Sequence, residues 1–386
     1  MSFHFTRFTL IVAPIAATLV AACSGPPTAP PTATVKLYVA DEGSGTISVI
    51  DAQRNVHFAT IDLSEQRATG PARFNAHNVQ VAPNGASVWV TAVPMAGAGH
   101  TEADAGSPAM DSGHGGHGGT DAMPGGAEMP EEIVIIDPRT DRVVARIELG
   151  TGLHVAHVVF DSTSQNAFVT ANEGDRVLQI DTNSHAIVRR FELGTARGPH
   201  GLRQCGGRLF VANMRGLSMS VVDLGTGNVQ EIPLGGVAVQ TACTSDGRYA
   251  FVSLYDTREV VRYDVQSGEL RRLTLPDGSQ GPIQLYPTPD NRRVFVCDQG
   301  NLLGRPPSNR LYEVDADQLR VTSTMEVGRA AHGVIVNEDG TRAFVTNTLD
   351  NTVSVVDTRS HSVIATVAVG LAPNGIAHLH VGGGMP

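Results

Sequence analysis

Two neighbouring segments, Ala343-Phe344-Val345-Thr346-Asn347 and Thr352-Val353-Ser354-Val355-Val356-Asp357, decide the fold of this 386-residue chain. Both are short runs rich in alternating β-branched residues, which is typical of β-strands. The dipeptide Asp339-Gly340, just before the first segment, supplies the positive φ angles that a tight hairpin requires. The pattern therefore predicts consecutive antiparallel strands joined by tight turns.

The same pattern recurs along the chain, and the aspartate that closes its third strand marks each unit. The seven marker residues are Asp51, Asp137, Asp181, Asp223, Asp264, Asp315 and Asp357. Five of the six intervals are 44, 42, 41, 51 and 42 residues, and the first interval, 86, contains a long insertion. We expect these aspartates to cap blade turns, because their side chains accept hydrogen bonds from the backbone. Seven markers predict seven four-stranded units.

A period of about 42 residues with four short strands is typical of a β-propeller blade. Residues Lys36 to Leu63 supply three later strands, and Leu371 to Val381 supply one first strand. Together they complete one blade from both ends of the chain, which leaves no open sheet edge. We predict an all-β, seven-bladed propeller over residues 35–381, with a short tail at 382–386.

These strands resemble the YVTN-type β-propeller repeat. The resemblance rests on Phe344-Val345-Thr346-Asn347 with Thr352 to Asp357, and on the variant Tyr38-Val39-Ala40-Asp41 with Gly45 to Asp51. It implies a seven-bladed ring and a secreted or surface-attached protein, in a family mostly without assigned activity. Related rings include lactonases and the propeller of nitrous oxide reductase, so the fold alone does not fix a function.

Charge and composition exclude two classes of partner. The formal net charge is −10, which removes the electrostatic basis for binding nucleic acid phosphates. Lys36 is the single lysine, and no basic patch is available for a membrane surface. The 42 glycines and 22 prolines agree with a turn-rich chain of short strands.

The first residues are typical of an export signal. Arg7 precedes an apolar stretch, Phe8 to Val20, which is too short for a permanent membrane span. Val20-Ala21-Ala22-Cys23 resembles a bacterial lipobox, in which Cys23 becomes the acylated first residue. We therefore expect a lipoprotein signal at 1–22 and a Pro-rich tether at 23–34. Ser24 favours anchoring to the outer membrane on its periplasmic side, and we expect a monomer held by this lipid alone.

Histidines mark one end of the predicted channel. Aligning the blades at the start of their first strands predicts one ring of equivalent positions, made of His77, His157, His200, Val239, Ile283, His332 and Asn374. Imidazoles suit copper, zinc, iron or nickel, and the arrangement resembles the copper-holding propeller of nitrous oxide reductase. Val239 and Ile283 interrupt the ring, however, and Pro-His-Gly turns also occur in repeats without metal. Both a structural and a metal-binding role stay open.

A second candidate metal site lies in the long insertion, residues 93–130. The insertion contains His100, His114 and His117 together with Met110 and Met123. Thioether and imidazole ligands favour copper, with zinc as an alternative, whereas the opposite interpretation is a plain Gly/Ala linker. Links between second and third strands lie on the same face as the first-strand starts, and so does the loop from Gly300 to Arg310. We expect function at this loop face.

The sequence leaves several functions open. We favour a non-enzymatic, extracytoplasmic binding protein that uses the loop face for a ligand, a partner protein or a metal ion. Alternatives are a copper- or zinc-handling protein and a propeller enzyme, either a metal-dependent oxidoreductase or a lactonase-like hydrolase. No catalytic residue and no definite cofactor are assigned. Cys205 and Cys243 either form a disulfide or remain, with Cys297, as buried thiols.

Overall fold

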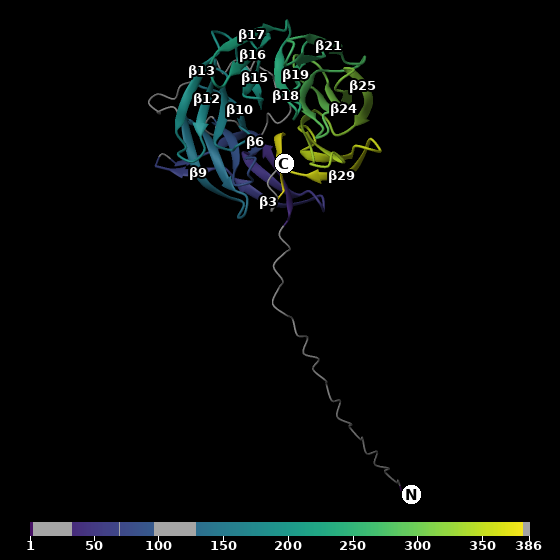
Figure 1. Cartoon of the computed structure of the whole chain (residues 1–386). Helices are drawn as coiled ribbons and strands as arrows, with labels where there is room; N and C mark the ends of the chain where they lie inside the picture. The colour runs from purple at the N-terminus through teal and green to yellow at the C-terminus, as the bar shows by residue number, and fades with distance from the viewer. Residues whose placement is uncertain (3–32, 69, 96–128, 381–386) are drawn as a thin grey trace. The chain divides into compact units, whose positions relative to one another are not determined.

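The computed structural model describes residues 1–2, 33–68, 70–95 and 129–380. Contacts divide the chain into Met1–Thr32 and Ala33–Pro386, and the strands of the described residues belong to the second unit. In the described part of this unit, seven four-stranded antiparallel sheets surround a central axis (Figure 1). None of the described residues forms a helix with the length and hydropathy to cross a bilayer. The predicted seven-bladed propeller is confirmed.

Six blades follow one another along the chain, and we number them by their order. Blade 1 contains β6 (Phe74–Val81), β7 (Val88–Pro94), β8 (Glu131–Asp137) and β9 (Arg142–Gly150), and blade 2 contains β10 (Val155–Phe160), β11 (Asn166–Ala171), β12 (Arg176–Asp181) and β13 (Ile187–Glu192). Blade 3 contains β14 (Pro199–Cys205), β15 (Arg208–Asn213), β16 (Ser218–Asp223) and β17 (Val229–Pro233), and blade 4 contains β18 (Ala238–Cys243), β19 (Tyr249–Leu254), β20 (Glu259–Asp264) and β21 (Leu270–Thr274). Blade 5 contains β22 (Pro282–Pro287), β23 (Arg293–Gly300), β24 (Pro307–Asp315) and β25 (Arg320–Glu326), and blade 6 contains β26 (Ala331–Val336), β27 (Arg342–Asn347), β28 (Thr352–Asp357) and β29 (Ser362–Ala368).

Blade 7 is assembled from both ends of the propeller, as expected. Its sheet order is β3 (Val56–Asp62), β2 (Thr46–Asp51), β1 (Val35–Asp41) and β30 (Pro373–His380). The β30 strand pairs antiparallel with β1, and Tyr38 lies opposite Ala377. The β30 strand also packs against β6 of blade 1 and β26 of blade 6, so the ring is closed. A small hairpin, β4 (Glu65–Arg67) and β5 (Gly70–Ala72), precedes blade 1 and was not predicted.

Each blade places one aromatic side chain from its second strand, counted from the channel, into the interior. These seven residues occupy equivalent register positions and are almost fully buried: Tyr38, Trp89, Phe168, Phe210, Phe251, Phe295 and Phe344. Trp89 also packs edge to face on Phe160 of blade 2, with ring centroids 5.3 Å apart. Large aromatic rings bury much apolar area, so these positions hold neighbouring blades together.

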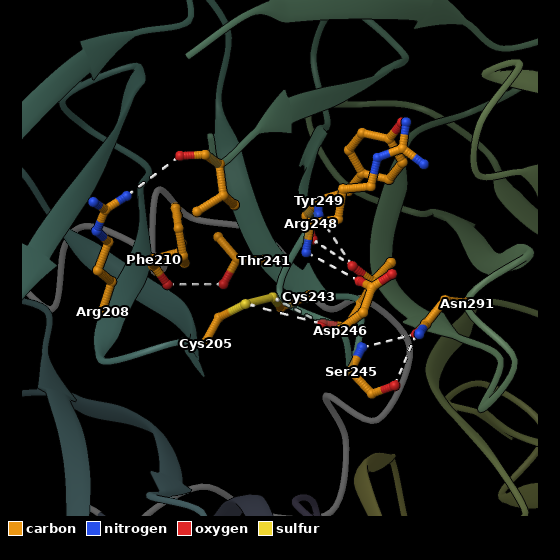
Figure 2. Close-up of a disulfide and its surroundings, with 12 residues drawn as sticks. Cys205, Arg208, Phe210, Thr241, Cys243, Ser245, Asp246, Arg248, Tyr249 and Asn291 are labelled. Atoms are coloured by element: carbon orange, nitrogen blue, oxygen red, sulfur yellow. Dashed lines mark hydrogen bonds between the residues drawn. A yellow bond between two sulfur atoms is a disulfide. The ribbon is translucent and has the colours of Figure 1, made fainter. Parts of the chain in front are cut away.

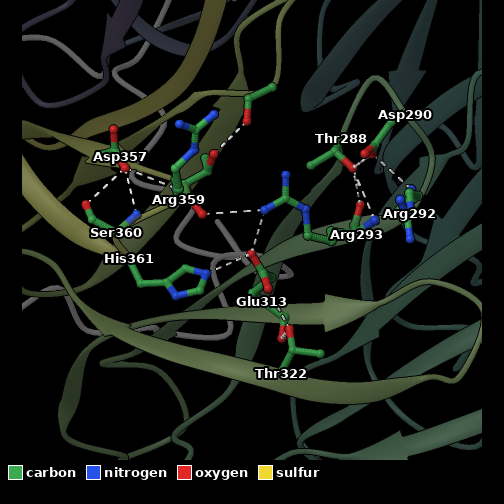
Figure 3. Close-up of polar contacts among 12 residues, drawn as sticks. Thr288, Asp290, Arg292, Arg293, Glu313, Thr322, Asp357, Arg359, Ser360 and His361 are labelled. Carbon is green, nitrogen blue, oxygen red and sulfur yellow. Dashed lines mark hydrogen bonds and ion pairs between the residues drawn. The ribbon is translucent and has the colours of Figure 1, made fainter.

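The seven marker aspartates all end a third strand, as predicted. Their carboxylates accept hydrogen bonds from backbone N–H groups two or three residues later; Asp357, for example, accepts from Arg359 and Ser360 (Figure 3). These bonds lower the pKa of Asp357, chiefly through the backbone N–H of Ser360. The residue four positions after the aspartate has a positive φ at every blade, from Asn55 (57°) to His361 (55°). The aspartate therefore fixes the tight turn into the fourth strand.

A basic residue at the start of the second strand joins four pairs of neighbouring blades. Each donates to the backbone carbonyl directly after the marker aspartate of the next blade: Lys36 to Pro138, Arg208 to Val265, Arg293 to Thr358 and Arg342 to Ala52. Figure 3 shows the Arg293 guanidinium between this carbonyl and the carboxylate of Glu313. The sequence repeat did not reveal these inter-blade hydrogen bonds, because each connects residues of different units.

Candidate functional site

The first strands of all blades begin at one end of the channel, which we call the histidine mouth. The hydrogen-bond register corrects the predicted alignment by one residue in blade 2. The backbone carbonyls of Ala156 and His200 accept the equivalent bonds from Thr91 and Thr170, at 2.8 and 2.7 Å. Ala156 is therefore the counterpart of His200, and His157 lies one position deeper. The register irregularity near the start of the first strand is at the same place in blades 2 and 3, so the offset comes from the position of the histidine itself.

Three of the four predicted ring histidines nevertheless meet at this mouth. His77, His157 and His200 are all buried, and one ligand nitrogen from each lies within 4.8 Å of the others. The His157 and His200 rings are 4.7 Å apart between centroids, and His77 lies 5.4 Å from each of them. Their mutual orientation is edge to face. His332 is buried at an equivalent position of blade 6 but does not belong to this group.

Polar neighbours orient the three rings. His200 Nδ1 lies 2.9 Å from the backbone oxygen of Val239. A carbonyl only accepts, so His200 carries its proton on Nδ1 and its other nitrogen, Nε2, has the lone pair in the neutral ring. His77 Nδ1 lies 2.9 Å from a carboxylate oxygen of Glu42, which follows β1. A histidine that donates one N–H to a carboxylate or carbonyl presents its second nitrogen as a metal ligand.

The contact of His157 is different. Its Nδ1 lies 3.3 Å from Nε2 of Gln240, whose Oε1 accepts from the backbone N–H of Thr241 at 2.9 Å. That second bond fixes the orientation of the amide, so Gln240 donates to His157 Nδ1. Gln240 is itself buried. Asn374, the residue of the predicted ring on the first strand of blade 7 (β30), donates to Glu42 at 2.7 Å and thereby holds the carboxylate beside His77.

The long insertion leaves blade 1 after Pro94 and returns at Glu131, on the side of the histidine mouth. The predicted ligands His100, His114, His117, Met110 and Met123 lie outside the described residues. The other loop on this face, between Gly300 and Arg310, is held by its arginines. Arg305 donates to the backbone oxygens of Tyr255, Asp256 and Gln280, so its guanidinium serves to fix the loop.

Cys205 and Cys243 form a disulfide between the first strands of blades 3 and 4 (Figure 2). Cys297 remains a buried thiol, and burial raises its pKa well above the usual value. Figure 2 also shows Ser245, which donates through its backbone N–H and hydroxyl to Asn291 Oδ1 in the next blade, at 2.8 and 3.0 Å. The disulfide resolves the alternative left open by the sequence.

A cavity of about 820 Å³ lies at the opposite end of the channel, where the first strands finish, which we call the arginine mouth. Its walls come from first-strand ends, such as Arg203 and Tyr286, and from first turns, such as Pro289 and Glu338. Sequence reasoning missed this cavity. The sequence feature that could have indicated it is Arg203, because this charged residue lies in a strand that the repeat period places at the centre of the ring.

Residues 212–382 match the sequence model of the family described as YNCE-like beta-propeller. This part of the chain is similar in sequence to a YNCE-like propeller. The predicted resemblance to propeller repeats of this kind is thereby confirmed. No curated protein matches the chain in sequence.

Solved propellers resemble this ring in fold. A functionally unknown protein from Desulfotomaculum acetoxidans is 15% identical, covers 89% of this chain and 99% of its own, and gives a TM-score of 0.65. Hydrazine synthase from Kuenenia stuttgartiensis is 14% identical over 79% of this chain and 90% of that one (TM-score 0.60). Virginiamycin B lyase from Staphylococcus aureus is 14% identical over 78% and 87% (TM-score 0.58). These identities support the fold alone.

Proposed function

We propose that this protein binds a transition-metal ion at the histidine mouth, through His77, His157 and His200. The observation that carries the proposal is the convergence of three buried imidazoles, with ligand nitrogens within 4.8 Å of one another. In a tetrahedral site with Zn–N bonds of about 2.0–2.1 Å, ligand nitrogens are roughly 3.4 Å apart. Binding of an ion in this geometry therefore requires the three rings to rotate so that their ligand nitrogens come closer together.

Copper and zinc are the metals that this ligand set fits best. Neutral imidazole is a ligand for both, and a given nitrogen site binds Cu(II) more tightly than Zn(II). Glu42 supports the site because its carboxylate, 2.9 Å from His77 Nδ1, makes that imidazole more basic. Three protein ligands leave one coordination position for water or an external ligand.

The coordination position that the three histidines leave open supports a second candidate function, an enzyme that acts at the same mouth. A metal with three histidine ligands activates a bound water or substrate, as both a metal-dependent oxidoreductase and a lactonase-like hydrolase require. Binding of the metal is the step that both functions share, so it is tested first.

Titration calorimetry with CuSO₄ and ZnCl₂, on protein purified without a histidine tag, tests the proposal. We expect one tight site in the parent and a loss of affinity of more than about 100-fold in the double variant His77→Gln/His200→Gln, because two ligands are removed. His361→Gln is the matched control, since this half-exposed histidine contacts Glu313 at a blade turn. The same titration on a variant without residues 96–128 distinguishes metal bound at the histidine mouth from metal bound by the insertion. Equal affinity in the double variant and the parent would overturn the proposal.

We also propose that the protein is exported and lipid-anchored through Cys23. The Cys205–Cys243 disulfide supports export, because disulfides persist in oxidising compartments outside the cytoplasm. Cys23→Ala is expected to release the protein from the membrane fraction into the soluble fraction, because a lipid chain is the anchor in this proposal. Cell fractionation after a high-salt wash measures this. A variant that stays in the membrane pellet would contradict the anchor.

A further inference from the structure

The arginine mouth differs from the histidine mouth in chemistry as well as position. Arg203 lies on β14, three residues after His200. Along the strand, about 10 Å therefore separates the level of Arg203 in the channel from the level of His200. The cavity of about 820 Å³ is of the size that small organic ligands occupy. The three histidines of the proposed metal site are not among the residues that line this cavity.

Arg203 is the central charged group of this cavity. It extends from blade 3, Tyr286 extends from blade 5, and the intervening first strand of blade 4 has only Ala242 at the equivalent position. Burial lowers the pKa of Arg203, and the neighbouring Tyr286 partly offsets this. Within the described residues, the guanidinium makes one long hydrogen bond, from Nη1 to the backbone oxygen of Leu202 at 3.4 Å.

A guanidinium has five N–H donors in a planar fork, and the fork matches a carboxylate. Arg203 therefore retains donor capacity in a region where burying a charge is costly. Glu338 and His378 also line the cavity, and Glu338 adds negative charge at its rim. Because this carboxylate lines the same cavity, it favours a ligand with a single negative charge over a multiply charged phosphate.

The remaining walls are mostly apolar. Val159 and Phe160 come from blade 2, Pro287 from blade 5, and Ile335 and Val336 from blade 6. A ligand that satisfies Arg203 and also covers these walls has a charged end and a hydrocarbon body.

We propose that the arginine mouth binds a small organic monocarboxylate, with the carboxylate on Arg203 and the apolar body against Phe160 and Ile335. The site is independent of the metal at the histidine mouth. Binding stabilises the protein because it gives a partly buried cation its counter-ion.

Benzoate and hexanoate are suitable probes, with benzamide as the neutral analogue and inorganic phosphate as the anion without an apolar body. Calorimetry and thermal shift on the parent are expected to show binding of both carboxylates, and weaker or no binding of benzamide and phosphate. Arg203→Gln is expected to weaken benzoate binding by about 10-fold or more, since charge-assisted hydrogen bonds are lost. Arg203→Lys keeps the charge but loses the fork, and an intermediate affinity is expected.

Two controls keep the result interpretable. Arg203→Gln is expected to unfold at the same temperature as the parent or higher, because it removes a partly buried charge that forms no ion pair among the described residues, so loss of binding does not reflect misfolding. Arg329→Gln, an exposed arginine paired with Asp350, is the matched charge control and leaves benzoate binding unchanged. Equal benzoate affinity in Arg203→Gln, tighter binding of phosphate than of benzoate, or no carboxylate binding to the folded parent would each overturn the proposal.

Discussion

Asp41 differs from its counterparts in two other blades by carrying a charge. It occupies the second-strand position that holds Asn213 in blade 3 and Asn347 in blade 6. All three side chains contact the same kind of partners, two hydroxyls five and seven residues later: Thr46 and Ser48, Ser218 and Ser220, Thr352 and Ser354. Asp41 is fully buried, and desolvation raises its pKa from 3.8 to about 6 although the hydroxyls oppose the shift. Its ionised form is therefore a cost at neutral pH.

Asp41→Asn is expected to stabilise the protein at pH 7. The folded state holds the Asp41 proton more tightly than the unfolded state, so this contribution to stability is present below about pH 4 and is lost as pH rises through about 6. This pKa shift corresponds to about 3 kcal/mol of unfolding free energy. Asp41→Asn is expected to gain this full amount only above pH 6, where the carboxyl group of the parent is ionised. Urea unfolding at pH 4, 5.5 and 7 measures the difference, which should nearly vanish at pH 4.

Asp264→Asn provides a control of opposite sign. The backbone N–H of Ser267 is the main cause that lowers the pKa of Asp264, so its charge stabilises the fold at neutral pH and the contribution is lost in acid. The asparagine variant is expected to be less stable than the parent at pH 7. An Asp41→Asn protein that is equally stable at pH 7, or less stable, would contradict the assigned cost.

Single strands and turns were predictable where the repeat itself carries the signal. Each marker aspartate and each tight turn depends on residues close in sequence, so a pattern within one unit suffices. The histidine alignment was wrong in blade 2, because it matched residue types and not hydrogen-bond register, and His157 lies one position beyond the residue that is equivalent to His200. The Cys205–Cys243 pair and the contacts of Arg203 depend on neighbouring blades, which no pattern within one unit describes.

Lys36 makes an inter-blade contact whose contribution to the stability of the fold can be measured. Its ammonium is almost fully buried and lies 2.7 Å from both the backbone oxygen of Pro138 and a carboxylate oxygen of Asp141 in blade 1. Tyr38 also donates to this carboxylate at 2.7 Å, and this contact adds to the burial that raises the pKa of the phenol. The cluster attaches the closing blade to its neighbour.

Lys36→Met is expected to destabilise the protein by about 3 kcal/mol or more, because it leaves Asp141 without its buried cation. Lys36→Arg is the matched control, since the other three blades use arginine for the same bond, and it should stay within about 1 kcal/mol of the parent. The urea midpoint at constant pH measures both variants. If methionine and arginine gave the same midpoint, the contact would contribute only packing.

The ring as a whole was predictable because seven period markers and two incomplete ends have one simple solution. The two functional faces were harder to predict from the sequence. The sequence directed attention to the histidine mouth, where three side chains do converge, whereas its one sign of the cavity at the far mouth was Arg203. A cavity depends on which side chains fail to fill a shared space, here with Ala242 between Arg203 and Tyr286, and that is a property of the assembled ring.

Closure by β30 gives the final prediction. Deleting residues 371–386 removes the strand that pairs with β1 and packs against β6 and β26, so two neighbouring blades lose a partner and β1 becomes an unpaired edge. Exposed edges of this kind pair with other chains. We expect loss of the single cooperative unfolding transition and a shift from monomer to aggregate in size-exclusion chromatography. Deleting only residues 381–386 leaves β30 intact and is expected to preserve both properties. A chain without β30 that melts at the parent temperature as a monomer would show that the other six blades are stable without the closing strand.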